Sequence, residues 1–276
     1  MASCIFLGGA VHQRYVGYGE KERQIRMATS VKNDIGEMFK FAAGHSQVVV
    51  NRQGSGYRHE MKVKSILLNE DISSDLHSQV SSTVAGLGGA SESLFDLATL
   101  KRYTSKDWVR HEIRTFLQND LSNNLIIFMT GHGGQRMEQD RKVVESFLLP
   151  KQGSADTDHY TDVELTEDIV NALPSNKKLY IVMHCCHSGG MVNFWQLDTN
   201  KQVALFASAE ADLLAEWSSE DDTNFVTTFC SKAGLRTRKQ LNTIADEIYQ
   251  TLHSVPTIRP VFKTTRPSMA GETFLS

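Results

Sequence analysis

Two apolar segments that each run into a glycine-containing loop constrain this chain more than any other feature. Residues 124–129 (Asn-Leu-Ile-Ile-Phe-Met) lead into Thr-Gly-His-Gly-Gly, and residues 179–183 (Leu-Tyr-Ile-Val-Met) lead into His-Cys-Cys-His-Ser-Gly-Gly. Short apolar runs of β-favouring residues bounded by glycines are typical of buried strands that end in loops. In α/β sheets, the loops beyond the carboxyl ends of the strands bind ligands. We therefore expect one strand to deliver a histidine, and the next a cysteine, to the same edge of a sheet.

Predicted strands and helices alternate along the rest of the chain, which indicates an α/β fold with a largely parallel sheet and helices on both faces. No linker or internal repeat is visible, so we expect one domain over residues 1–276. The strands are expected at Cys4–Leu7, Val48–Val50, Val63–Leu68, Val143–Leu149 and Val203–Ala207, and the helices at Arg23–Ala43, Glu164–Leu173, Phe225–Ala233, Lys239–Leu252 and in a segment that Thr104 would cap. A turn is expected at Gly54–Gly56, loops at Ser73–Ser93, Lys151–Asp162 and Ser218–Asp222, and mostly extended chain in the last 20 or so residues.

The composition excludes several classes of protein. Of the 276 residues, 40% are hydrophobic and 22% charged, as in ordinary globular proteins. A net charge of −3 without basic clusters argues against nucleic acid as a partner. The apolar runs are far shorter than the roughly 20 residues of a membrane span, and the amino terminus lacks the charged region of a signal peptide. Four cysteines without a pairing pattern indicate a reducing, cytoplasmic environment.

A cysteine and a histidine on neighbouring strand ends suit nucleophilic catalysis. A cysteine attacks only as a thiolate, and a nearby histidine can take the thiol proton. His132 and Cys186 lie 54 residues apart, close to the spacing of about 50 residues known from caspases. The backbone N–H groups of Gly133 and of the nucleophilic cysteine would form an oxyanion hole, in which one donor is worth about 10²–10³ in rate.

The two loops, taken in this order, resemble those of the caspase-like cysteine peptidases, and most closely those of metacaspases. Metacaspases have a Ser/Thr-Gly-His-Gly block followed by an Asp-Cys-Cys-His-Ser-Gly or Asp-Ser-Cys-His-Ser-Gly block. The resemblance implies a three-layer α/β/α fold with a mostly parallel central sheet. It also implies that His132 is the catalytic histidine and that Cys186, which directly precedes His-Ser-Gly, is the nucleophile. Cys185 falls where the family accepts serine or cysteine.

The chain departs from the metacaspase pattern in its substrate pocket. The family has an aspartate two residues before the nucleophile, where it lines an acidic pocket for Arg or Lys, and this chain has His184 there. Loss of a charge from a desolvated pocket weakens the selection of a cation. Asp212 resembles a second acidic position that would compensate. The resemblance thus implies substrate-binding roles for His184, Ser208 and Asp212 and leaves a basic or an acidic cleavage residue open.

The chain also departs from the pattern in its calcium ligands. Many metacaspases bind Ca²⁺ through several aspartates, including an Asp-Asp pair that reads Asp162-Val163 here, and Asn193 stands where a further acid is expected. A calcium ion takes six to eight oxygens, so this set is thin. We expect no organic cofactor, and Ca²⁺ activation stays open.

Several alternatives compete with these assignments. Cys185 suits core packing, and His187 suits a structural or loop-orienting role. The His-Cys-Cys-His cluster at 184–187 invites a zinc site, although adjacent strand residues point to opposite faces. Acidic residues form either a solvated loop or an ion site: Glu145, Asp156, Asp158 and Asp162.

We therefore expect a cysteine endopeptidase that hydrolyses peptide bonds of protein or peptide substrates through a thioester acyl-enzyme. One alternative is a legumain-like or transamidase-like enzyme with the same fold. Another is a catalytically silent scaffold or adaptor. The sequence does not predict an oligomeric state.

Overall fold

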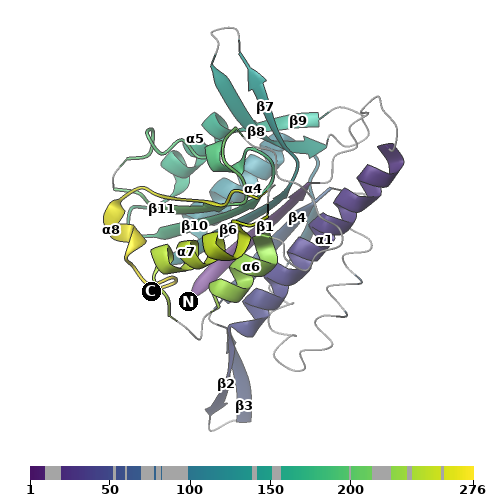
Figure 1. Ribbon diagram of the computed structural model, residues 1–276. Coiled ribbons are helices and arrows are strands. Elements are labelled where there is room, and N and C mark those ends of the chain that lie inside the picture. Colours follow the sequence, from purple (N-terminus) through teal and green to yellow (C-terminus); the bar gives the residue numbers. More distant parts are fainter. Residues whose placement is uncertain are drawn as a thin grey trace.

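The computed structural model (Figure 1) describes residues 1–9, 20–51, 54–59, 61–69, 78, 82, 99–138, 142–150, 157–198, 200–212, 225–234, 238–255 and 258–276. At its centre is a seven-stranded sheet in the order β12-β11-β10-β6-β1-β4-β5. Its strands are β1 (Ala2–Gly9), β4 (Met61–Leu68), β5 (Thr99–Arg102), β6 (Asn124–Gly131), β10 (Lys178–His184), β11 (Gln202–Ala207) and β12 (Val261–Thr264). All neighbouring strands are parallel except the edge strand β12, which pairs antiparallel with β11.

Helices cover both faces of this sheet. One face packs against α1 (Glu20–Gly44), α6 (Phe225–Lys232) and α7 (Leu241–Leu252), which Figure 1 shows together on one side. The other face packs against α4 (Lys106–Asn119) and α5 (Asp162–Ala172). The central strands are apolar at nearly every position because side chains on both faces are buried. The three-layer α/β/α fold with a mostly parallel sheet is confirmed.

Alternation along β10 decides where its side chains lie. Tyr180 and Val182 belong to the core under α1, α6 and α7, whereas Ile181 and Met183 belong to the core under α4 and α5. Successive strand residues point to opposite faces. The side chain of His184 therefore points toward α1, and that of Cys185 toward the other core.

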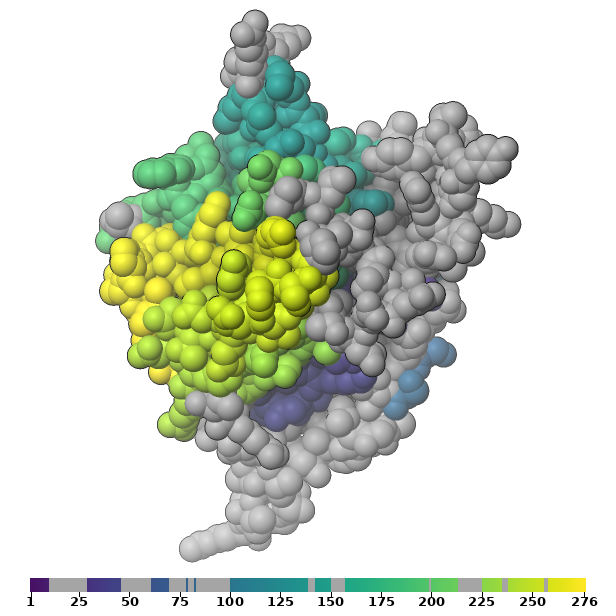
Figure 2. Space-filling model, viewed as in Figure 1, coloured from purple at the N-terminus to yellow at the C-terminus, as the bar shows by residue number. Residues whose placement is uncertain are grey.

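Two smaller sheets project from the body of the molecule (Figure 1). One contains β7 (Gly133–Met137), β8 (Val143–Pro150) and β9 (Thr157–Thr161), and β7 begins directly after His132. The other is the hairpin of β2 (Ser46–Asn51) and β3 (Gly54–His59). Figure 2 shows that α7 and the C-terminal residues, including the short helix α8 (Pro267–Ala270), form one continuous surface.

Three local predictions were wrong. The turn expected at Gly54–Gly56 lies within β3, and the loop expected at Lys151–Asp162 contains β9 and the first residue of α5. The N-cap of α4 is Ser105 rather than Thr104, because the Ser105 hydroxyl accepts a hydrogen bond from the Trp108 N–H. In each case a neighbouring residue or strand supplied hydrogen bonds that the local pattern did not reveal.

Other predictions are not tested by the fold. The loop expected at Ser218–Asp222 lies outside the described residues, and so does Ser73–Ser93 apart from Ser78 and Ser82. The single domain over residues 1–276 stays a prediction. None of the helices in the described part of the chain combines the length and the apolar character that a bilayer crossing requires.

Candidate active site

The histidine and cysteine loops leave the sheet side by side. Strands β6 and β10 are parallel neighbours, and Thr130 is the register partner of His184 at their carboxyl ends. His132 and Cys186 each follow two residues after this pair. The expectation that neighbouring strands bring both loops to one edge is thus met by the topology.

The backbones of the two loops approach each other closely at Gly133. A Cβ atom built on Gly133 would lie 1.8 Å from the carbonyl oxygen of Cys186 and 2.7 Å from its carbonyl carbon. No side chain fits in this space, so glycine is required by the approach itself. The Leu148 N–H donates to the His132 carbonyl at 2.9 Å, which ties the histidine loop to β8. The structure therefore brings the residue after His132 against the backbone of Cys186.

The cysteine loop turns sharply after β10. His187 adopts a left-handed conformation (φ 57°, ψ 17°), which is uncommon for a residue with a side chain and marks a constrained turn. Its Nδ1 lies 2.8 Å from the carbonyl oxygen of Ala211, and the Gly189 N–H donates to the Ala209 carbonyl at 2.8 Å. The Ala209 N–H donates in turn to the Ser188 hydroxyl. These bonds hold the turn against the segment that follows β11, and they fit a loop-orienting role for His187.

The two adjacent cysteines occupy different environments. Cys185 is fully buried in the core under α4 and α5, and burial raises the pKa of its thiol well above the usual value. Cys186 lies beyond the strand, is 8% exposed and packs beside Ala209. Because only a thiolate attacks, the environment of Cys185 favours packing, whereas Cys186 lies outside that core, at the loop beside Gly133.

His132 is only partly buried, and burial lowers its pKa to about 4. An imidazole with this pKa is neutral at pH 7, so it is in the form that accepts a proton from a thiol.

The three residues expected to bind substrate are not equivalent. Ser208 is buried, and its hydroxyl donates to the Cys185 carbonyl and lies 3.4 Å from the Ser188 hydroxyl. Asp212 is exposed beyond the same segment. His184 is only 3% exposed, and its Nδ1 lies 2.7 Å from Oδ2 of Asp34 on α1. The structure brings Ser208 to the cysteine loop and turns His184 toward α1.

Sequence reasoning missed Asp34, and a signal for it was present. Val31, Ile35 and Met38 form a buried helical stripe, and Asp34 shares their face by spacing. A carboxylate in such a stripe requires a buried partner.

The implied calcium ligands can be tested against unsatisfied oxygens. Oδ1 of Asp162 and Oδ1 of Asn193 are both buried, and neither has a hydrogen-bond partner among the described residues. The Asn193 N–H donates to the Thr166 hydroxyl, which lies one turn after Asp162 on α5. Burial and the nearby charge of Glu145 raise the pKa of Asp162. Orphaned oxygens beside a second carboxylate fit a hard cation.

Glu145, Asp162 and Asn193 are the residues that would hold such a cation, and they come from β8, α5 and the segment that follows the cysteine loop. The zinc alternative is not supported by placement, because His184 and Cys185 point to opposite faces. In the part of the chain that the structure describes, no three His, Cys, Asp or Glu side chains gather as a metal site.

A three-layer α/β fold whose parallel sheet presents a histidine loop and a cysteine loop at one edge is the arrangement that the resemblance to caspase-like cysteine peptidases implies. Residues 95–195, which include both loops, match the family model of the metacaspase peptidase C14 domain. The match supports a caspase-like cysteine peptidase at the level of the family. No curated protein matches the chain in sequence.

Solved structures agree on the fold. The protein GSU0716 from Geobacter sulfurreducens superposes with a TM-score of 0.60 at 12% identity, over 100% of this chain and 98% of that one. Caspase-1 from Spodoptera frugiperda superposes with a TM-score of 0.50 at 11% identity, over 95% of this chain and 86% of that one. With the family match, this confirms the resemblance to caspase-like cysteine peptidases, closest to metacaspases.

Proposed function

We propose that the chain is a cysteine endopeptidase that cleaves protein or peptide substrates with Cys186 as nucleophile and His132 as its acid–base partner. The observation that carries the proposal is the approach of the Gly133 backbone to the Cys186 carbonyl, because it brings the histidine and cysteine loops together at the sheet edge. The metacaspase match over residues 95–195 supports the same class of chemistry.

The reaction begins when neutral His132 takes the proton of the Cys186 thiol. The thiolate attacks the carbonyl carbon of the scissile bond, and the negative charge moves to the carbonyl oxygen, which accepts hydrogen bonds from the N–H groups of Gly133 and Cys186. Protonated His132 then gives its proton to the departing amine, and the C–N bond breaks to leave a thioester. Water, deprotonated by His132, attacks the thioester, and the thiol of Cys186 leaves with a proton.

The residue that precedes the cut depends on the charge of the pocket beside Cys186. A pocket for Arg or Lys needs a carboxylate that can face the substrate. Asp212 is exposed after β11 and can supply one, whereas the Asp34 carboxylate already accepts hydrogen bonds beneath the loops. Cleavage after basic residues would assign Asp212 to the pocket. Cleavage after other residues would indicate that the replacement of the family's aspartate by His184 changes the specificity.

The test is digestion of a mixed peptide library, read by mass spectrometry, with wild type, Cys186→Ala, His132→Ala and Cys185→Ala, each with and without Ca²⁺. Cys185→Ala is the matched control, because it removes the neighbouring thiol from the core. We expect cuts by wild type and Cys185→Ala and none by the other two. Cleavage by Cys186→Ala would refute the nucleophile.

Two further outcomes would favour the alternative functions, a transamidase-like enzyme or a catalytically silent scaffold. An added amine that is joined to the new carboxyl end would indicate a transamidase. If no protein cuts and Cys186 reacts with iodoacetamide no faster than a free thiol, the scaffold alternative replaces the peptidase.

A further inference from the structure

A carboxylate from α1 lies buried beneath the two loops of the candidate active site. Oδ2 of Asp34 accepts a hydrogen bond from the Thr130 hydroxyl at 2.6 Å and lies 2.7 Å from Nδ1 of His184. Asp34 and Thr130 are fully buried, and the ring of Phe225 packs beside His184 with 6.0 Å between ring centroids. A carboxylate oxygen accepts, so we assign the Nδ1–H of His184 as the donor to the same oxygen.

The network lies at the same distance along the chain from both candidate catalytic residues. Thr130 and His184 are register partners at the ends of β6 and β10, and each precedes its catalytic candidate, His132 or Cys186, by two residues. Oδ2 of Asp34 therefore contacts the last paired residues of both strands, directly before the two loops begin. Any shift of one strand end relative to the other changes the distance from imidazole to thiol.

Packing alone does not account for a carboxylate at this position. Burying a carboxylate is costly, and a buried ion pair is often no more stable than apolar side chains of similar volume. The neighbours of Asp34 along the stripe, Val31, Ile35 and Met38, are apolar and fully buried, as core packing requires. Asp34 contributes directional contacts that an apolar side chain cannot make, because its two hydrogen bonds fix the side chains of Thr130 and His184.

We propose that Asp34 is a positioning residue that, through Thr130 and His184, holds the His132 and Cys186 loops in reactive register. The inference rests on the proposed Cys186–His132 dyad. It differs from a substrate contact, because the network acts on the strand ends and not on a side chain of the substrate.

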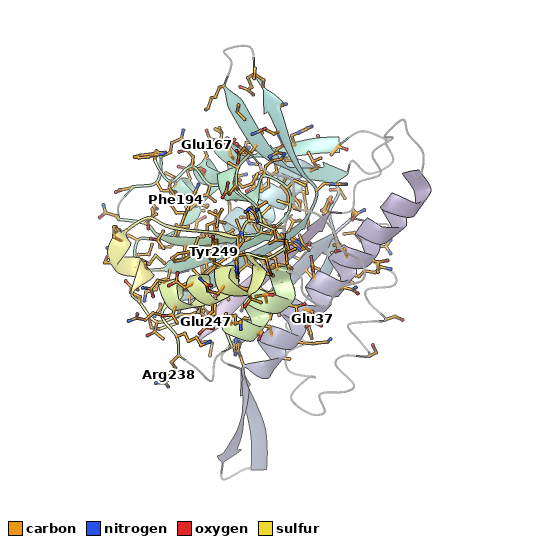
Figure 3. All side chains as sticks on the ribbon, in the orientation of Figure 1. Glu37, Glu167, Phe194, Arg238, Glu247 and Tyr249 are labelled. Carbon is orange, nitrogen blue, oxygen red and sulfur yellow. The ribbon has the colours of Figure 1, made fainter. Side chains whose placement is uncertain are left out.

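The convergence of both bonds on one oxygen provides a sharp test. In Asp34→Asn, the amide oxygen can occupy the place of Oδ2 and accept both hydrogen bonds, so the charge is lost and the geometry is kept. In Asp34→Ala, both bonds are lost. Glu37→Gln is the matched control: Glu37, labelled on α1 in Figure 3, pairs with Lys40 at the surface.

Two rates are measured for each protein. The first is alkylation of Cys186 by iodoacetamide as a function of pH, followed by mass spectrometry of the peptide that contains it. This reagent has no side chain for a pocket to recognise. The second is cleavage of the best library peptide, resolved into kcat and KM.

We expect Asp34→Ala to slow both alkylation and kcat by about 10²-fold with little change in KM, because misplacement by about 1 Å costs that much. Asp34→Asn should stay within about threefold of wild type, and Glu37→Gln should be unchanged. If both Asp34 variants alkylate like wild type but raise KM alike, Asp34 contacts the substrate and the positioning role is refuted.

The remaining outcomes distinguish a failure of the proposed dyad from a failure of the proposed role of Asp34. If wild-type Cys186 alkylates as slowly as a free thiol and cuts nothing, the dyad fails and the positioning role fails with it. Fast alkylation that no variant alters leaves the dyad standing and removes only the role of Asp34. Circular dichroism verifies folding, and if Asp34→Ala does not fold, Thr130→Val against Thr130→Ser gives the same comparison for one hydrogen bond.

Discussion

Gly133→Ala tests the close approach on which the candidate active site depends. The new Cβ would lie 1.8 Å from the Cys186 carbonyl oxygen, whereas real Cβ contacts stay at 3.0 Å or beyond, so the atoms must separate by at least 1.2 Å. The obstacle is backbone, which cannot rotate away as a side chain can. Displacement of about 1 Å costs about 10²-fold in rate, and loss of an oxyanion donor costs about 10²–10³-fold. We expect kcat/KM to fall by at least 10²-fold.

Gly134→Ala provides the matched control one residue further on. Its Cβ would meet a methyl group of the Leu148 side chain at 3.2 Å, which a small rotation relieves. The assay is kcat/KM on one peptide, with the melting temperature of each variant to confirm folding. Gly134→Ala should retain activity within a few fold. If folded Gly133→Ala is as active as wild type, the approach of the two loops has no part in catalysis, and the proposed oxyanion hole is wrong.

Three further predictions concern stability and ions. Burial lowers the pKa of His132 to about 4 and that of His45 to about 3, so the unfolded chain takes up protons below pH 6.5 that the folded chain does not. The free energy of unfolding should fall from pH 7 to pH 5 in urea titrations, and less in His45→Phe. Arg110→Ala removes two hydrogen bonds of 2.9 Å to the buried Asp168 carboxylate and should lower the unfolding free energy by about 2–3 kcal/mol, measured in urea. If a cation binds at the unpaired oxygens of Asp162 and Asn193, millimolar Ca²⁺ should raise the melting temperature of wild type but not of Asp162→Asn, and an equal rise in both would exclude Asp162 as a ligand.

The parts of the fold that local sequence determines could be predicted. Continuous apolar runs indicated the buried strands β6 and β10, and glycines marked the loops that follow them. The short strand β9 escaped notice because its sequence, Thr-Asp-His-Tyr-Thr, is mostly polar. It is a strand because it pairs with β8, and no periodicity within five residues reveals a partner strand.

In the candidate active site, too, local sequence indicates some residues, whereas others are identified only by contacts between distant parts of the chain. Each loop carries its candidate side chain next to a glycine or a sharp turn, so a window of a few residues indicates His132 and Cys186. Asp34 lies 96 residues from Thr130 and 150 residues from His184, and its role exists only because α1 packs on the face toward which both side chains point. Strand alternation alone places His184 on that face, but it does not identify the helix that covers it. A carboxylate in an apolar helical stripe indicates that a buried partner exists, and only the packing of the helix on the sheet identifies the partner.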